Sequence, residues 1–218
     1  GPFARGEAIA PAYLEERLPV QEPLSLGTLH NLVYDPDAPE GTLPAISHEE
    51  LWQRLTHFLR ELTPVAEEEG VRLAAHPDDP PVPVLRQTPR ILCDPAGMQR
   101  LLDSVPSRSN ALRLCVGTVQ EMPGVDAYEV VETFSRRGAI SYVHCRNVRG
   151  KVPHYTEVFI DEGDVDIFRV LRILRDNGFD GAVIPDHTPQ MTCGAPWHAG
   201  MAHALGYLRA AMAAIEGR

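Results

Sequence analysis

Apolar residues recur along this chain in short runs and in longer segments with helical spacing. The first long segment follows Ser47-His48-Glu49-Glu50, which has the form of a capping box, and it predicts a helix that ends at Gly70. Pro64 lies inside this segment, so we expect a kink or an early end there. Four later segments also have helical spacing: 95–104, 126–137, 164–177 and 197–215.

Short apolar runs lie between these segments and predict β-strands at 71–75, 111–114, 140–143 and 181–184. Strands that alternate with amphipathic helices are typical of βα units on a parallel sheet. Residues 1–46 differ, because they are rich in Pro and Gly and have weak periodicity. We therefore expect a loop-rich N-terminal segment at 1–46, with a short helix at 11–18, and one α/β domain at 47–218.

A residue of a type that commonly binds metals stands one or two positions after the end of each predicted strand. These residues are His76, Cys115, His144 and Asp186. The carboxyl ends of parallel strands lie on one face of a sheet, so we expect the four side chains to converge. Imidazole, thiolate and carboxylate groups are the usual protein ligands of a divalent transition ion. Each of these residues taken alone also fits a structural role. The metal hypothesis depends on finding ligand-type residues at four successive strand ends.

Composition narrows the classes of partner. The chain has 30 acidic and 20 basic residues and a net charge of −10. This charge disfavours nucleic acids and anionic membranes, which are bound through clustered Lys and Arg, but it is compatible with a small anionic substrate. No apolar run approaches the roughly 18 residues that span a bilayer. The four cysteines form no C-x-x-C pair, which indicates reduced thiols and a cytoplasmic protein.

Five longer motifs stand at or near the predicted strand ends. They are H-P-D-D-P-P at 76–81, G-T-V-Q-E-M at 117–122, H-C-R-N-V-R-G at 144–150, F-I-D-E-G-D-V-D at 159–166 and P-D-H-T at 185–188. In this order, over residues 47–212, the motifs resemble the mannonate dehydratase family of xylose-isomerase-like metalloenzymes.

The resemblance implies a (β/α)8 TIM-type barrel, whose N-terminal βα units we expect to be missing or shortened in this chain. It implies a lyase that removes water from D-mannonate to give 2-keto-3-deoxy-D-gluconate, a step of glucuronate catabolism. It also implies Mn²⁺ as the cofactor, with Fe²⁺, Co²⁺ and Zn²⁺ as alternatives. The family's metal ligands fall on His76, Cys115, His144 and Asp186, and its catalytic histidine falls on His187.

Other side chains near these motifs are candidates for the substrate site. Arg146 stands two residues after His144, on the same strand face, and we expect its guanidinium to bind the substrate carboxylate and take part in catalysis. Asn147 and Asp161 are expected to bind substrate hydroxyls. The structural alternatives are an ion pair for Arg146 and a solvated loop for the acidic run at 161–164.

The resemblance has one departure in the active-site motifs. A catalytic tyrosine of the family is expected after the Asp-His motif, but residues 193–201 contain no tyrosine. His198 and His203 are candidates to replace it. This departure keeps two alternatives open: a metal-dependent sugar isomerase or epimerase on the same barrel, and a non-catalytic truncated homologue. Part of a barrel would expose two sheet edges, so we also expect a homo-oligomer.

Overall fold

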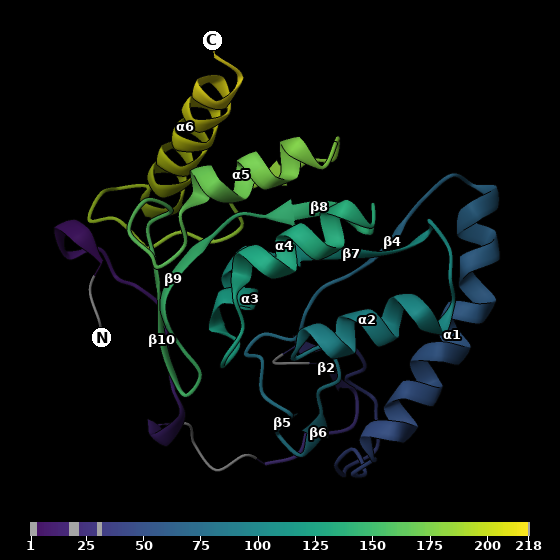
Figure 1. The fold of residues 1–218 in the computed structure, drawn as a ribbon. Helices are drawn as coiled ribbons and strands as arrows, with labels where there is room; N and C mark the ends of the chain where they lie inside the picture. The colour runs from purple at the N-terminus through teal and green to yellow at the C-terminus, as the bar shows by residue number, and fades with distance from the viewer. Residues whose placement is uncertain (1–3, 18–21, 30–31, 218) are drawn as a thin grey trace.

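The computed structural model describes residues 4–17, 22–29 and 32–217. Its centre is a four-stranded sheet with the strand order β11-β8-β7-β4, in which all neighbours are parallel. The strands are β4 (Leu73–Ala75), β7 (Asn110–Cys115), β8 (Ile140–His144) and β11 (Val183–Ile184). Their order across the sheet follows their order along the chain (Figure 1). The α/β class with a parallel sheet is therefore confirmed, whereas a closed eight-stranded barrel stays a prediction.

A helix follows each of these strands. The helices are α2 (Pro95–Ser104), α4 (Ala127–Arg136), α5 (Ile167–Asp176) and α6 (Pro196–Glu216), and α1 (His48–Glu68) precedes β4. Helix α4 packs on α5, and α5 packs on α6, so consecutive helices share one layer (Figure 1). The five helices predicted within residues 47–218 are all present. Four of them begin at a polar N-cap whose side chain accepts a backbone hydrogen bond: Ser47, Asp94, Asp126 and Asp166.

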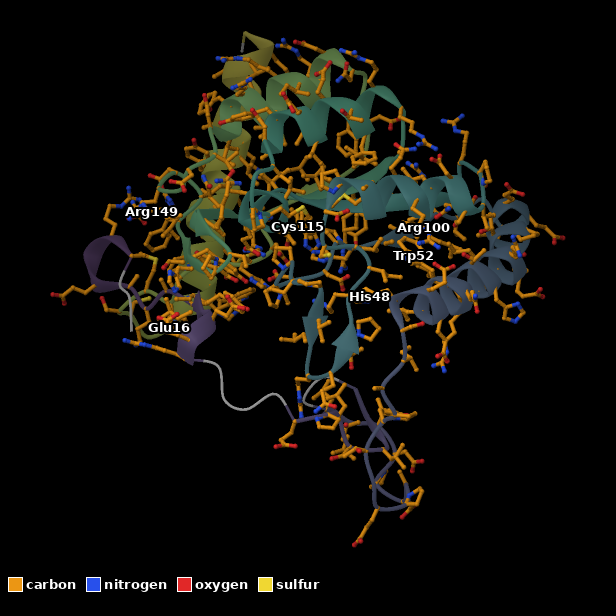
Figure 2. The ribbon with its side chains drawn as sticks, turned by 60° about the horizontal axis from the view of Figure 1, so that its bottom comes forward. Glu16, His48, Trp52, Arg100, Cys115 and Arg149 are labelled. Carbon is orange, nitrogen blue, oxygen red and sulfur yellow. The ribbon has the colours of Figure 1, made fainter. Side chains whose placement is uncertain are left out.

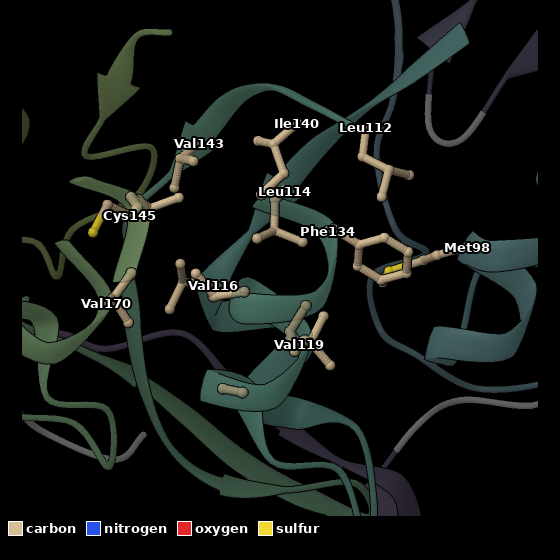
Figure 3. Packing of buried hydrophobic residues seen from close by; sticks show 14 of the residues in the cluster. Met98, Leu112, Leu114, Val116, Val119, Phe134, Ile140, Val143, Cys145 and Val170 are labelled. Carbon is tan, nitrogen blue, oxygen red and sulfur yellow. The ribbon is translucent and has the colours of Figure 1, made fainter. Parts of the chain in front are cut away.

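The hydrophobic core lies between the helices and one face of the sheet (Figure 3). Leu112 and Leu114 of β7 are fully buried there, together with Val143 of β8. Successive side chains of a strand point to opposite faces, so the residues that follow Leu114 and Val143 point away from this core. Those residues are Cys115 and His144. Core packing thus fixes which face of the sheet carries the predicted ligands.

Helix α1 runs through Pro64 to Glu68, so the predicted early end is wrong. A proline inside a helix removes one hydrogen bond and costs roughly 3 kcal/mol. Leu59, Thr63 and Ala66 are buried on both sides of the proline, and this burial favours the continued helix. The chain then turns at Gly70, which has a φ of +65° as expected for a residue after a helix end.

The predicted helix at 11–18 is also wrong over the described residues. Strand β1 (Ala12–Leu14) and a 3-10 turn (Glu15–Arg17) stand there, and Leu18 lies outside the described residues. Strand β1 pairs antiparallel with β10 (His154–Val158), and the rings of Tyr13 and Tyr155 stack with centroids 5.2 Å apart. This long-range pairing overrides the local pattern. The rest of the segment is loop-rich, with the two-residue strands β2 (Thr28–Leu29) and β3 (Leu32–Val33) and a 3-10 turn at Arg5–Glu7.

Three further features were not predicted. Helix α3 (Val116–Glu121) starts immediately after Cys115, and β9 (Asn147–Lys151) forms a hairpin with β10 between β8 and α5. Strands β5 (Val84–Leu85) and β6 (Thr88–Pro89) form a small hairpin in the loop after β4. No helix among the described residues is both long and apolar enough to cross a membrane.

Lys151 joins the β9–β10 hairpin to the end of α3. Its ammonium donates hydrogen bonds to the carbonyls of Gln120, Met122 and Val125, at 2.6, 3.0 and 3.0 Å. These carbonyls follow the last turn of a short helix, where backbone acceptors lack helical partners. The hairpin and α3, which both carry residues of the site described below, are therefore held in one arrangement.

We predict that Lys151→Met lowers the free energy of unfolding by about 2 kcal/mol, because three carbonyls lose a charged donor. Urea denaturation measures this change. Arg136→Met is the control, since Arg136 is 73% exposed and its side chain pairs with one described residue, Glu132, and we expect a change within about 0.5 kcal/mol. Equal effects of the two variants would contradict the role given to Lys151.

Candidate metal centre

Three predicted ligands meet at the carboxyl end of the sheet. Cys115 and His144 are opposite each other in the β7–β8 register, and His76 follows the last residue of β4. One ligand atom from each of the three residues lies within 4.8 Å of the others. Cys115 is fully buried and lies near the middle of the molecule (Figure 2). The structure thus brings together two imidazoles and one thiol in the arrangement that a metal ion needs.

The fourth predicted ligand, Asp186, lies beside this cluster but outside it. Its Oδ1 is 3.1 Å from His144 Nδ1, an ion-pair distance, although this buried nitrogen has no partner with hydrogen-bond geometry among the described residues. Its Oδ2 is 3.5 Å from Arg146 Nε. Asp186 has a φ of +66°, a left-handed conformation that costs a non-glycine residue roughly 1 to 2 kcal/mol. Such strain is typical of functional positions.

The ring of His76 is already oriented. Its Nδ1 is 2.5 Å from the carbonyl oxygen of Pro77, so the nitrogen that carries the proton is Nδ1 and the free ligand atom is Nε2. A hydrogen bond from the second ring nitrogen to a backbone carbonyl is the usual way in which proteins orient a metal-binding histidine.

Electrostatics favour a cation at this cluster. Burial acts to raise the pKa of Cys115, but Arg146, His144 and His76 outweigh it and hold the pKa well below its ordinary value, which favours the thiolate. Burial acts to lower the pKa of His144, but Asp186 and Cys115 raise it to about 9. The metal-free cluster therefore holds a proton on His144 that a bound ion would displace.

Arg146 is buried among carboxylates from four parts of the chain. Only 2% of its side chain is exposed. Its Nη1 donates to Glu121 Oε1 at 2.7 Å and lies 3.5 Å from Glu157 Oε1, Nη2 contacts Asp79, and Nε faces Asp186. One guanidinium is thus shared by four acids, which leaves an excess of negative charge beside the three candidate ligands. A divalent cation would offset this excess.

Gly117 of the G-T-V-Q-E-M motif makes room for this guanidinium. A Cβ at this position would lie 2.7 Å from Arg146 Cγ and 2.9 Å from Nη1. Any larger residue would therefore displace the buried arginine. Thr118, the next residue, accepts a hydrogen bond from Arg146 Nη2 at 3.1 Å. The motif serves the packing and polar contacts of Arg146.

Two predicted substrate-binding residues have internal partners instead. The Asn147 amide donates to the carbonyls of Ile160 and Val165, both at 2.8 Å, and its oxygen accepts from the backbone N–H groups of Val148 and Val165. Asn147 is 1% exposed, so the geometry favours a structural role over contact with substrate. The guanidinium of Arg146 is similarly enclosed and does not face open space.

Asp161 lies in a more open place. Its carboxylate accepts two hydrogen bonds from Arg5, at 2.9 and 3.0 Å, and lies 3.3 Å from His203 Nε2. Its side chain is 25% exposed. Arg5 and His203 line a cavity of about 260 Å³ together with Phe159 and other residues. His198, the other candidate to replace the tyrosine, is exposed on α6.

His187 stands next to the candidate ligands. Its Nδ1 is 3.0 Å from Glu157 Oε2, and this hydrogen bond is the main reason why the pKa of His187 is raised. Its Nε2 lies 3.9 Å from Asp186 Oδ1, and its side chain is 49% exposed. An imidazole beside a metal cluster, open to solvent on one side, is suited to proton transfer.

The sequence interpretation missed the acids around Arg146, namely Asp79, Glu121 and Glu157, and also Tyr155. The Tyr155 hydroxyl donates to Asp79 Oδ1 at 3.1 Å. Tyr155 and Glu157 are two residues apart on β10 and therefore share a strand face. The sequence indicates this shared face only if residues 154–158 are first predicted to be a strand. Asp79 and Glu121 stand inside the motifs of the resemblance, which was the available signal for them.

We predict that the metal-free protein loses stability at rising pH through Glu121, which is fully buried. Burial raises the pKa of Glu121 to about 9, the ion pair with Arg146 opposes this rise, and the nearby negative charges of Asp79 and Cys115 add to it. The folded chain thus holds this proton more tightly than the unfolded chain, in which Glu has a pKa of about 4.3. The stability from this proton is complete below about pH 4.3 and is lost as the pH rises toward 9.

Glu121→Gln removes this titration and keeps the side-chain shape. Its free energy of unfolding relative to the unchanged chain should therefore rise between about pH 5 and pH 8.5, by at most about 1.4 kcal/mol per pH unit. Urea unfolding at several pH values in the presence of a chelator measures the difference. Parallel pH profiles for the two proteins would contradict a protonated Glu121.

Comparisons with known proteins show the family of this chain. A family profile described as D-mannonate dehydratase (UxuA) matches residues 13–216. The mannonate dehydratase of Lactococcus lactis subsp. cremoris is 33% identical over 180 residues, which are 78% of this chain and 50% of that protein. Mannonate dehydratase 2 of Halalkalibacterium halodurans is 33% identical over 160 residues, 71% of this chain and 46% of the relative. The chain thus spans about half the length of the curated relatives it matches.

Solved structures show the same relationship. The crystal structure of mannonate dehydratase from Streptococcus suis serotype 2 superposes with a TM-score of 0.71 at 30% identity, over 78% of this chain and 50% of that chain. A xylose isomerase domain protein from Planctomyces limnophilus superposes with a TM-score of 0.61 at 14% identity, over 81% of this chain and 60% of the other, and this shows a shared fold alone. The profile match and the 33% identity together show that this chain belongs to the D-mannonate dehydratase family.

Proposed function

We propose that this chain carries the metal site and the proton-transfer group of a hydro-lyase that converts D-mannonate to 2-keto-3-deoxy-D-gluconate. The observation that supports this best is the cluster of His76, Cys115 and His144, with ligand atoms within 4.8 Å, in a chain of the mannonate dehydratase family. His187 stands beside this cluster. The substrate is then a small anionic sugar acid.

The residues present fit a divalent ion. We infer that His76, Cys115 and His144 bind it, with Asp186 as the fourth ligand because its carboxylate already pairs with His144. The two imidazoles, the thiolate and the carboxylate are compatible with Mn²⁺, Fe²⁺, Co²⁺ or Zn²⁺, and the family resemblance favours Mn²⁺. When bound, the ion supplies a Lewis acid that holds substrate oxygens and stabilises negative charge next to the carboxylate.

His187 is the proposed acid–base group. Loss of water from D-mannonate removes the proton on the carbon next to the carboxylate and expels the hydroxyl of the following carbon as water. The enol that results becomes the keto acid when that following carbon gains a proton and the enol hydroxyl loses its own. The His187 imidazole, whose side chain is 49% exposed, is proposed to take or give one of these protons through Nε2.

Arg146 acts through its neighbours in this proposal. Its buried guanidinium holds Asp186 and Glu157 in place and favours the thiolate of Cys115. It does not face the space where a substrate carboxylate would bind. Asp161 stays the candidate for binding a substrate hydroxyl, because its side chain is partly exposed near the cavity lined by Arg5 and His203.

Family membership disfavours the isomerase or epimerase alternative, since the relatives named here are mannonate dehydratases. A homo-oligomer is part of the proposal for a physical reason. Among the described strands, nothing pairs with the outer edges of β4 and β11, and free edges of a parallel sheet are ordinarily covered. A non-catalytic homologue would bind metal and give no product.

The test is an assay for the 2-keto-3-deoxy acid after incubation with Mn²⁺ and D-mannonate. We expect product that is lost on chelation and in Cys115→Ser, and that falls about 100-fold or more in His187→Ala. His57→Ala, on the exposed side of α1, is the matched control and should keep full activity. Product formation that persists in the chelated sample, or full activity of His187→Ala, would contradict the proposal.

A further inference from the structure

We propose that Glu157 is a positioning residue that fixes the tautomer of His187, with the proton on Nδ1 and the lone pair on Nε2. The use of that lone pair in turnover rests on the proposed function. The tautomer itself is a property of the folded chain and can be measured without substrate.

The first step of the argument is the contact between the two side chains. Glu157 Oε2 is 3.0 Å from His187 Nδ1. An ionised carboxylate only accepts hydrogen bonds, so the nitrogen at this distance must carry the proton. In a neutral imidazole, the other nitrogen is then an acceptor. The contact therefore selects one of the two neutral tautomers of His187.

The second step is that the Glu157 carboxylate is itself held. Its side chain is 12% exposed, and its other oxygen, Oε1, lies 3.5 Å from Nη1 of the buried Arg146. The backbone N–H of Glu157 donates to the carbonyl of Pro11 at 2.8 Å, just before β1. The acceptor is thus fixed from two sides, and this separates it from a flexible surface carboxylate that would follow the ring.

The third step is that Nε2 has no hydrogen-bond partner among the described residues. Asp186 Oδ1 lies 3.9 Å from it, which is beyond hydrogen-bond distance. The His187 side chain is 49% exposed, so the ring is partly open to solvent beside Asp186. One nitrogen is held by Glu157 and the other is not, which is the arrangement that a proton-transfer histidine requires.

The position of Glu157 depends on the β9–β10 hairpin. In the β9–β10 register Glu157 is opposite Val148, and Tyr155 on the same strand face reaches Asp79. The hairpin therefore positions the side chains of Tyr155 and Glu157 among the acidic residues around Arg146. This gives the hairpin a part in the chemistry as well as in the packing.

The direct test is the tautomer of His187 in the Zn²⁺-loaded chain labelled with ¹⁵N-histidine. Long-range ¹H–¹⁵N correlation spectra distinguish the two neutral tautomers, and the His187 signals are those absent from His187→Ala. At a pH where the ring is neutral, we expect the Nδ1–H form to dominate in the unchanged chain. We expect this preference to be lost in Glu157→Ala and in the isosteric Glu157→Gln, whose amide accepts and donates.

Glu162→Gln is the matched control, because Glu162 is also a glutamate near the hairpin that faces an arginine, Arg149, and it does not contact His187. The number of Zn²⁺ ions bound per chain reports whether the cluster of His76, Cys115 and His144 is folded in each variant. If Glu157→Ala does not fold, Glu157→Gln still tests the tautomer. An Nε2–H form in the unchanged chain, or the same tautomer in all Glu157 variants, would overturn the proposal.

Kinetics separate this proposal from the proposed function. If D-mannonate is the substrate, Glu157→Gln should lower kcat by about 10- to 100-fold with little change in KM, and Glu162→Gln should change neither. Absence of turnover in the unchanged chain would reject the dehydratase and leave the tautomer result standing. Normal kcat in Glu157→Gln together with a changed tautomer would reject the positioning role alone.

Discussion

The burial of one guanidinium organises the end of the sheet where the predicted ligands lie. Removing the charge of Arg146 from water is unfavourable by several kcal/mol unless acceptors surround it. The four acids that do so belong to different segments: Asp79 after β4, Glu121 in α3, Glu157 in β10 and Asp186 after β11. Each of these segments must therefore adopt the position that brings its carboxylate to Arg146. Gly117 leaves the space that this convergence needs.

The same interaction prepares the metal cluster. The positive charge of Arg146 favours the thiolate of Cys115, and its contact with Asp186 holds the fourth predicted ligand next to His144. With Glu121 protonated, the carboxylates of Asp79, Glu157 and Asp186 and the thiolate of Cys115 still exceed the positive charge of one guanidinium and the protonated His144. A divalent ion at His76, Cys115 and His144 would reduce this excess, so the stability of the acidic surroundings and the affinity for metal are linked.

Much of this arrangement was readable from the sequence, because it depends on local patterns. Helical spacing located α1, α2, α4, α5 and α6, with a capping box for α1, and short apolar runs located the strands. The ends of three strands gave His76, Cys115 and His144 because parallel strands share one direction. The hairpin β9–β10 and its pairing with β1 were not readable, since residues 12–14 and 154–156 meet only in the fold.

Residue roles were harder to predict than residue positions. Spacing put Arg146 on the same strand as His144, but its burial among acids depends on four other segments. Asn147 was predicted as a substrate ligand, yet its amide is saturated by the backbone around it. Glu157, which contacts both Arg146 and His187, has no signal in the sequence apart from the alternation of a strand that was not recognised.

The central claim is that Cys115 and two histidines bind a divalent ion at the carboxyl end of the sheet. The most direct test is the absorption spectrum of the chain loaded with Co²⁺, because a thiolate bound to Co²⁺ gives an intense charge-transfer band in the near ultraviolet. The account predicts about one Co²⁺ per chain with this band, and loss of the band in Cys115→Ser while the fold is kept. A spectrum without the band, or one that is unchanged in Cys115→Ser, would contradict it.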